Sequence, residues 1–453
     1  MAGEIATATR RLLRSPMFTL VAVVTLAIGI GASAAILSVV RGVLLKPLPY
    51  PDAESLVGVW HTSPEHGNWM HAHVSYLFYR DQSTVFEEMG LYQAGRANLT
   101  GGERPEELAA IDVSPSLLRV LGVSPVLGHT FLDGASDPEA DPVVIISHGL
   151  WQRRFGGDPE IAGSGVRVDG VRREIVGVMP RGFRVSDVDA DLVLPMVIDR
   201  SNPERGLWGN ICVARLRPGV SRDAAQREAD ALAARLHEAF PDPEAARQFF
   251  ERAGIGLAVT SLKDDIVENV ADVLWVLLGC VGVVLAVAIA NVASLFLVRA
   301  DVRQHEVALR GALGATRTAI ARGMTIESLV VTSAGSAAGL ALAVVGLRAF
   351  VNLAPPGIPR LDEVGVDLPV VVFVAVVGIL SGLVFGIVPV LRKTGELTAA
   401  LGDGGRGSTG GRVRQRAREL LVVGQLALAL ALLVTSGLMV RSFLELRAVD
   451  PGC

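Results

Sequence analysis

Five stretches without a charged side chain constrain this chain more than any other feature. Each reaches about 20 residues or more, the length that an α-helix needs to cross the hydrocarbon core of a membrane. Half of all residues are hydrophobic, and the mean hydropathy is +0.44. We therefore predict a polytopic α-helical membrane protein with five transmembrane helices. With short flanks added, the predicted helices cover residues 17–40, 273–298, 325–350, 368–391 and 419–440.

The distribution of positive charge predicts how these helices are oriented. The cytoplasmic N-terminal segment, residues 1–16, carries Arg10, Arg11 and Arg14, and cytoplasmic loops are rich in Lys and Arg. Alternation then places the loop 299–323 and the Gly- and Arg-rich linker 392–418 inside as well, and both carry several arginines. The predicted topology is N-in and C-out. The first stretch is too long for a cleaved signal peptide, so we interpret it as an uncleaved anchor.

The long polar segment between the first two predicted helices, residues 46–268, is expected to form a large exported domain. Residues 142–147 and 174–179 have the composition of β-strands. Residues 221–239 have helical periodicity, and Ser221 is a suitable N-cap. Strands and helices together predict an α+β domain.

The cytoplasmic loop 299–323 has charges at helical spacing. Arg303, Glu306 and Arg310 stand at i, i+3 and i+7, so they share one face of a helix. Such a short charged helix at the inner leaflet is suited to contact a cytosolic protein. The alternative is that its positive charge only fixes the topology.

Two polar residues in the predicted spans are candidates for packing or relay. Asn291 lies deep in the second span, where an interhelical hydrogen bond is a commoner role for Asn than substrate binding. Glu327, near the inner end of the third span, is a candidate relay residue. Gly29 and Gly31 allow close helix approach, which fits either a dimer or a contact within one module.

Short motifs follow one another in a fixed order along nearly the whole chain. They are residues 29–32 with 43–50, residues 113–115 with 121–123, residues 147–159, residues 291–295, Glu306 and Arg310 with residues 312–315, and residues 385–389. In this order they resemble the MacB/FtsX-type ABC transporter permeases, and most closely the long bacterial permeases with two such modules in tandem.

The resemblance implies a four-span module of the bacterial cytoplasmic (inner) membrane, in which helices one and two bracket a periplasmic domain. It implies that the loop between helices two and three is a coupling helix that docks on a P-loop ABC ATPase subunit. By this resemblance Arg303, Glu306 and Arg310 are the candidate ATPase contacts. ATP would be bound by the partner, so no cofactor is expected on this chain.

The end of the chain departs from the tandem pattern. Residues 412–450 repeat the order of features in residues 10–47: basic residues, an apolar span and a charged exit. We therefore expect one complete module and the opening of a second, as a truncated gene would give. A second permease module or a homodimer is a candidate partner.

Several kinds of site are not expected. No catalytic motif is present, and in residues 401–411 Ser408 stands where a P-loop has lysine. A net charge of −4 does not suggest nucleic acid as a partner. Zinc or copper binding by His61, His66, His71 and His73 is an alternative to an ordinary exposed loop, but no Cys accompanies them, so no metal is predicted.

Three classes of function remain. The first is a permease subunit that couples a separate ATPase to work by the exported domain, in contact with membrane lipid. The second is a non-transporting membrane regulator of an envelope partner protein. The third, a membrane-anchored enzyme, has the least support, since the sequence shows no catalytic constellation.

Overall fold

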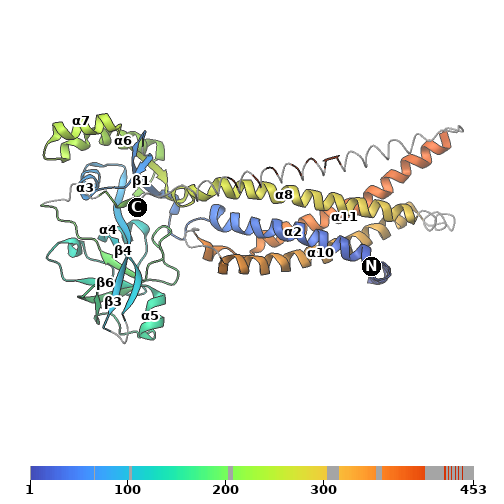
Figure 1. The fold of residues 1–453 in the computed structure, drawn as a ribbon, viewed down its shortest axis with the longest axis horizontal. Coiled ribbons are helices and arrows are strands. Elements are labelled where there is room, and N and C mark those ends of the chain that lie inside the picture. The colour runs from blue at the N-terminus through green and yellow to red at the C-terminus, as the bar shows by residue number, and fades with distance from the viewer. Residues whose placement is uncertain are drawn as a thin grey trace. The chain divides into compact units, whose positions relative to one another are not determined.

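The structure, a computed structural model, describes residues 2–65, 67–101, 105–201, 208–303, 316–353 and 360–402, with isolated positions between 423 and 441 (Figure 1). The chain divides into two compact units. Residues 47–269 form one, which we call the exported unit. Residues 1–46 together with 270–453 form the other, which we call the membrane unit.

One mixed β-sheet organises the exported unit. Its strands follow the order β11-β1-β10-β3-β4-β9-β6-β8-β5, and only the pairs β4–β9 and β6–β8 within this order are parallel. The short strands β2 and β7 pair beside this path. The strands are β1 (Leu56–Ser63), β2 (Gly67–Trp69), β3 (Phe86–Thr100), β4 (Glu106–Val113), β5 (Leu127–Gly128), β6 (Val143–Ile146), β7 (Gly165–Val168), β8 (Val171–Val178), β9 (Leu192–Pro195), β10 (Ile211–Leu216) and β11 (Gly256–Ser261).

Helices complete the exported unit and confirm the predicted α+β class. The helix predicted from Ser221 is α6 (Arg222–Arg235), and the Ser221 hydroxyl accepts a hydrogen bond from the Ala224 N–H. The two predicted strand segments are confirmed as β6 and β8. The other helices are α3 (His73–Gln82), α4 (Pro115–Leu121), α5 (His148–Phe155) and α7 (Pro243–Ala253).

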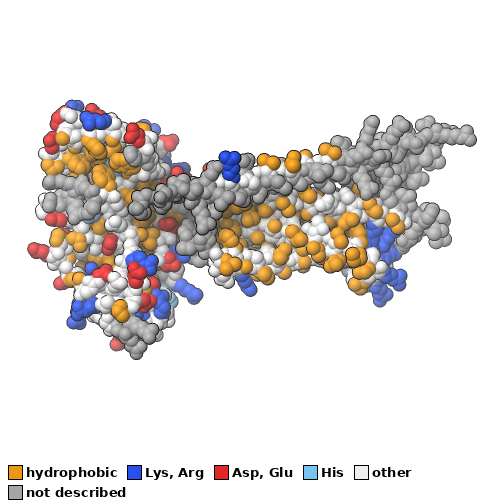
Figure 2. Space-filling model, viewed as in Figure 1, with side chains coloured by type: hydrophobic (Ala, Val, Ile, Leu, Met, Phe, Trp, Pro, Cys, Tyr) orange, Lys and Arg blue, Asp and Glu red, His pale blue; other side chains and the backbone are white. Residues whose placement is uncertain are grey.

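Four long apolar helices form the membrane unit, after a short N-terminal helix, α1 (Ala2–Leu13). They are α2 (Pro16–Val40), which a π-helical turn, η1 (Arg41–Leu45), extends, α8 (Leu262–Val302), α10 (Arg317–Leu353) and α11 (Leu368–Gly402). Figure 2 shows hydrophobic side chains gathered along them. Four of the predicted spans thus correspond to helices. The fifth, residues 419–440, lies almost wholly outside the described residues.

Small residues let the helices of the membrane unit pack backbone to backbone. A Cβ added at Gly29 would lie 2.8 Å from the Ala288 Cβ on α8, and one added at Gly31 would lie 2.8 Å from the Gly339 carbonyl oxygen on α10. Hydroxyl groups add interhelical bonds, since Ser328 on α10 donates to the Gly382 carbonyl on α11 at 2.6 Å. Of the two roles open for Gly29 and Gly31, the structure shows the contact within one module.

Helix α8 belongs to both units. Its first residues, from Leu262, lie in the exported unit, and the same helix continues through the span Val270–Ala300. At 1.5 Å per residue, its 41 residues amount to about 60 Å of continuous helix.

Candidate functional site

Glu327 lies at the centre of the only described charge cluster in which one carboxylate pairs with two arginines of the membrane unit. Its side chain, on α10, is 8% exposed. Arg303 donates from Nη1 to both carboxylate oxygens, at 2.8 and 3.1 Å. Arg299 Nη2 lies 2.8 Å from Oε1, as a close charge contact rather than an aligned hydrogen bond. Both arginines stand near the end of α8, one helical turn apart, so this end of α8 is joined to α10.

Aromatic side chains beside this ion cluster connect it to the other two long helices, α2 and α11. The Arg299 guanidinium lies 4.2 Å from the centre of the Phe18 ring on α2, in cation–π geometry. Phe18 meets Phe296 of α8 edge to face at 5.2 Å, and Phe296 stacks on Phe385 of α11 at 5.4 Å. We call these residues the Glu327 cluster. Its members are Phe18, Phe296, Arg299, Arg303, Glu327 and Phe385.

The physical chemistry of the Glu327 cluster makes it stiff. A carboxylate buried among apolar helices is expensive unless it is paired, and its loss would leave two neighbouring arginines without their anion. Each aromatic pair adds about 0.5–1.5 kcal/mol beyond the burial of its area. All four long helices therefore meet at one place where a relative displacement would break an ion pair or an aromatic contact.

A second polar cluster lies beyond the far end of α10. Arg360, 3% exposed, donates to the carbonyl oxygens of Val43 and Lys46 and forms a two-bonded ion pair with Glu363. Lys46 in turn donates to the Glu363 carbonyl at 2.9 Å. Arg41 pairs with Asp367 at 3.1 Å. The π-helical end of α2 is thereby tied to the start of α11.

Within the exported unit, the first turn of α8 is fixed to the sheet. The Trp60 indole on β1 donates to the Asp265 carboxylate at 2.8 Å. That carboxylate occupies the space that a side chain at Gly58 would need, so Gly58 is required for the contact. Burial raises the pKa of Asp265. A hydrogen bond and close packing therefore hold the first turn of α8 against strand β1.

The predicted site residues have different fates in the structure. Arg303 donates a hydrogen bond to Glu327. The sequence had predicted separate roles for these two residues. Asn291 is exposed, and its side chain forms no hydrogen bond with any other residue that the structure describes. Glu306 and Arg310 lie outside the described residues.

The expectation that the histidines lie in an exposed loop is wrong for His61 and His71. His61 and His71 are fully buried rather than in an exposed loop, because β1 and the bridge between His71 and Asn210 carry them into the core. Their rings lie 4.4 Å apart. No three metal-ligating side chains gather in the described part of the chain, and His66 is outside it.

Sequence reasoning missed Arg299, the three phenylalanines and Arg360. A usable signal existed for Arg299, since a lone carboxylate in an apolar span requires a cation, and Arg299 and Arg303 stand one turn apart at the end of the neighbouring span. The phenylalanines gave no signal, because an apolar residue in a span is expected whatever it contacts.

Two family models match the chain. Residues 19–232 match the MacB-like periplasmic core domain, and residues 279–394 match the FtsX-like permease C-terminal domain. The first match includes most of α2 and most of the exported unit. The second includes most of the span of α8, all of α10 and most of α11, and therefore Arg299, Arg303, Glu327 and Phe385.

A curated relative and several solved structures are also similar. The pyoverdine export ATP-binding/permease protein PvdT of Pseudomonas syringae pv. syringae (strain B728a) is 24% identical over 280 residues, which are 60% of this chain and 39% of that protein. The chain thus spans less than half the length of this relative.

The solved structures cover about half of the chain. A permease protein domain from Porphyromonas gingivalis is 20% identical, with a TM-score of 0.36 over 47% of this chain and 90% of that one. The periplasmic region of MacB from Actinobacillus actinomycetemcomitans is 11% identical, with a TM-score of 0.34 over 52% and 97%. The extracellular domain of the ABC-type transporter YknZ from Gram-positive bacteria is 12% identical, with a TM-score of 0.31 over 45% and 99%.

Proposed function

Because the chain belongs to the MacB/FtsX-type family of ABC transporter permeases, we propose that it couples ATP hydrolysis by a separate ATPase to movement of its exported unit. The observation that carries this proposal is the Glu327 cluster. It joins all four long helices, and its member Arg303 directly precedes, in the chain, the segment 304–315 on which the ATPase would dock.

The Glu327 cluster would receive force from the docked ATPase. A push on residues 304–315 acts on the ends of α8 and α10, which the ion pairs of Glu327 hold together. Since Phe18 and Phe385 lie in the same cluster, α2 and α11 would move with them. Arg303 is in this proposal a positioning residue for the docking segment, and Glu306 and Arg310 remain the proposed ATPase contacts.

Helix α8 would carry the movement outward. It runs without interruption from Leu262 to Val302, and its first turn is bonded to β1 through Trp60 and Asp265. An α-helix is stiff along its axis because each turn is hydrogen-bonded to the next. Rotation or translation of the span would therefore displace the sheet of the exported unit without any substrate passing through the bundle.

In this proposal the nucleotide chemistry belongs to the partner. The ATPase subunit binds and hydrolyses ATP, and this chain supplies no catalytic group. The name of the Pseudomonas relative assigns that protein to pyoverdine export. We propose export from the cell as the process driven here. A regulatory action on an envelope protein would use the same transmission.

Affinity purification of the tagged full chain from its own cells tests the docking. We expect a P-loop ATPase to co-purify with the unmodified chain and to be lost from the variant Glu306→Arg/Arg310→Glu. The matched control is Glu244→Arg/Arg247→Glu, which reverses an exposed i,i+3 pair on α7 and should retain the ATPase. Absence of an ATPase from every preparation, or its retention by the first variant, would contradict the assignment.

Deletion of the gene distinguishes export from regulation of an envelope protein. Export predicts that the deletion strain becomes sensitive to a toxic compound or fails to secrete a product. A regulatory role predicts an envelope or morphology defect with export unchanged.

A further inference from the structure

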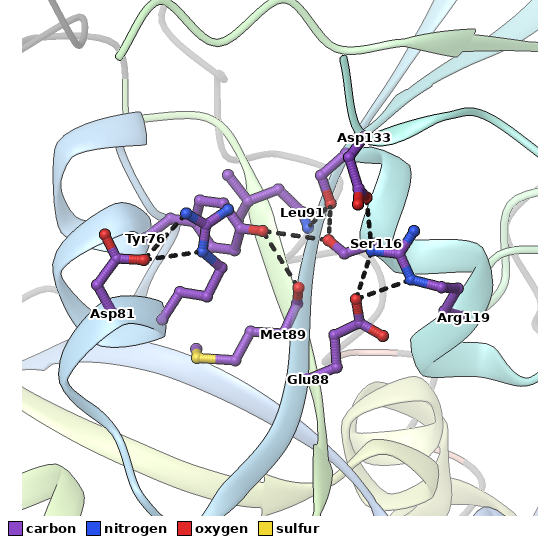
Figure 3. A network of polar contacts seen from close by, with 10 residues as sticks. Tyr76, Asp81, Glu88, Met89, Leu91, Ser116, Arg119 and Asp133 are labelled. Carbon is purple, nitrogen blue, oxygen red and sulfur yellow. Dashed lines mark hydrogen bonds and ion pairs between the residues drawn. The ribbon is translucent and has the colours of Figure 1, made fainter. Parts of the chain in front are cut away.

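Arg348, on α10 of the membrane unit, is an arginine without an ion pair or a side-chain hydrogen bond to any residue that the structure describes. Arg119 of the exported unit shows the opposite situation, since it is shared by Glu88 at 2.6 Å and Asp133 at 2.9 Å (Figure 3). An arginine in an apolar span is costly unless an anion compensates its charge, and such a residue often marks a functional site.

The position of Arg348 along α10 places it near the rim of the hydrocarbon layer. Exposed apolar side chains precede it at Val345 and follow it at Phe350 and Leu353, so it lies within the apolar surface of the helix. The helix ends at Leu353, about 7.5 Å further along its axis. An arginine side chain is long enough to reach the lipid headgroups from this depth. The available anions at this level are therefore the phosphates of lipids.

A cavity of about 600 Å³ lies beside Arg348. Its first wall is one face of α10, on which Leu347 and Val351 provide an apolar surface and Arg348 and Asn352 stand one turn apart. Its second wall is the loop segment 364–366. The volume falls in the range of about 300–1,000 Å³ that is usual for sites of small molecules. The cavity thus combines apolar walls with a guanidinium and an amide, both of which can donate hydrogen bonds.

Contacts with η1 hold the second wall in place. Val364 packs against Gly42, where an added Cβ would lie 3.0 Å from the Val364 Cα. On either side of this contact, Arg360 donates to carbonyl oxygens of residues 43 and 46, and Asp367 pairs with Arg41. The cavity walls are therefore preformed. Because η1 leads into the exported unit, this end of the bundle lies at the outer leaflet.

We propose that this cavity binds an anionic phospholipid of the outer leaflet, of the phosphatidylglycerol type. The Arg348 guanidinium binds the lipid phosphate through charge-assisted hydrogen bonds, Asn352 donates to the headgroup, and the apolar walls cover part of an acyl chain. The described carboxylates of the nearby loop, Glu363 and Asp367, are each already paired with an arginine. They are not free to bind the ammonium group of a zwitterionic lipid, so the charge balance favours a lipid with a net negative charge.

Binding of a phosphatidylglycerol with a fluorophore on one acyl chain tests the site, measured by fluorescence anisotropy on the purified full chain in non-ionic detergent. We expect saturable binding that dioleoyl phosphatidylglycerol displaces roughly tenfold more effectively than dioleoyl phosphatidylcholine does. Glycerol 1-phosphate, which has the anionic group without acyl chains, should not displace the probe. Equal displacement by the two lipids, or displacement by glycerol 1-phosphate, would overturn the proposal.

Two variants and a matched control separate this site from a general attraction of lipid to positive charge. Arg348→Gln changes an exposed side chain and should weaken binding about tenfold. Gly365→Leu should also weaken binding, because Gly365 lines the cavity and an added Cβ meets no atom within 4 Å, so a leucine has room to fill it.

The control Arg14→Gln removes an exposed positive charge before the start of α2 and should bind the probe as the unmodified chain does. Unchanged melting temperatures in detergent without lipid would show that the variants are folded. Equal weakening by Arg14→Gln and Arg348→Gln would overturn the proposal, and so would the absence of saturable binding by the unmodified chain.

Discussion

Glu327 is a buried carboxylate whose free energy depends on two arginines of a neighbouring helix. Sequence reasoning found Glu327 because it stands near the inner end of an apolar span, and found Arg303 because it has helical spacing with Glu306 and Arg310. It did not join them, since which faces of two helices meet is set by packing along the whole bundle. The contact of Arg299 with Phe18 was beyond prediction for the same reason, as α2 and α8 are separated by the entire exported unit.

Replacing Glu327 by Gln should destabilise the membrane unit. The change leaves Arg299 and Arg303 close together without an anion, and breaking a buried pair costs about 3–5 kcal/mol. Because Arg303 is partly exposed, we expect the lower end of that range. The melting temperature of the purified chain in detergent measures the effect. Asn291→Ala, at an exposed position on α8, is the control and should change it little. Equal melting temperatures for both variants would show that the cluster contributes no stability.

The buried pair of His61 and His71 should make the exported unit sensitive to acid. Burial lowers the pKa of His71 to about 4, and burial with the neighbouring His71 lowers that of His61 well below its usual value. In the unfolded chain both titrate near pH 6.5. Below pH 6.5 the unfolded chain therefore binds protons that the folded chain does not, and the free energy of unfolding falls. His71 alone accounts for about 3 kcal/mol between pH 6.5 and 4.

Denaturant unfolding of the full chain at several pH values, followed by tryptophan fluorescence, measures this loss. His61→Phe keeps an aromatic ring against Tyr79 and Trp208 but cannot take up a proton. Tyr79 and Cys212 stay neutral in this range, since a phenol and a thiol ordinarily titrate above it and burial raises the pKa of both further. The variant should lose less stability than the unmodified chain between pH 6.5 and 4. Parallel losses in the two proteins would refute the role of His61.

Among the helices and strands, those whose formation depends on residues close in sequence could be predicted. Helix α6 was predictable because Ser221 caps it and its buried residues recur at helical spacing. The 15-residue strand β3 was not, because its first half pairs with β10 and its second half with β4, and those pairings are long-range. The π-helical turn η1 was not either, since its end is stabilised by contacts with a distant segment: Arg360 donates to the carbonyls of Val43 and Lys46, and Lys46 donates to the Glu363 carbonyl.

Glycines at helix contacts should tolerate no side chain. A Cβ at Gly386 on α11 would lie 2.5 Å from the Thr325 Cα on α10, whereas one at Gly346 on α10 would meet nothing within 4 Å. Alanine favours a helix over glycine by about 1 kcal/mol. Gly346→Ala should therefore leave the melting temperature unchanged or raise it, and Gly386→Ala should lower it by separating two helices. If both changes raised the melting temperature, close packing of α10 on α11 would be contradicted.

At the scale of the whole molecule, the chain combines a bundle of helices and an exported α+β unit through one continuous helix. Apolar spans and arginine-rich loops predicted the bundle, and the polar segment between the first two spans predicted the exported unit. The order of the sheet could not be predicted, because it depends on pairings between strands far apart in sequence. The continuity of α8 from β11 into the membrane was likewise not evident, since polar residues 262–272 gave no sign of belonging to the same helix.

An electron paramagnetic resonance distance measurement tests whether movement passes along α8. Spin labels at Val126→Cys in the exported unit and Leu353→Cys in the membrane unit would use exposed positions. Cys280 and Cys453 would be replaced by serine, while Cys212 is buried and would not react. The complex with its ATPase would be measured with and without ATP and vanadate, and again with two glycines inserted between residues 269 and 270. We predict that the nucleotide shifts the distance in the continuous chain, and that the insertion abolishes the shift while ATP hydrolysis persists. A shift that survives the insertion, or no shift in the continuous chain, would contradict transmission through α8.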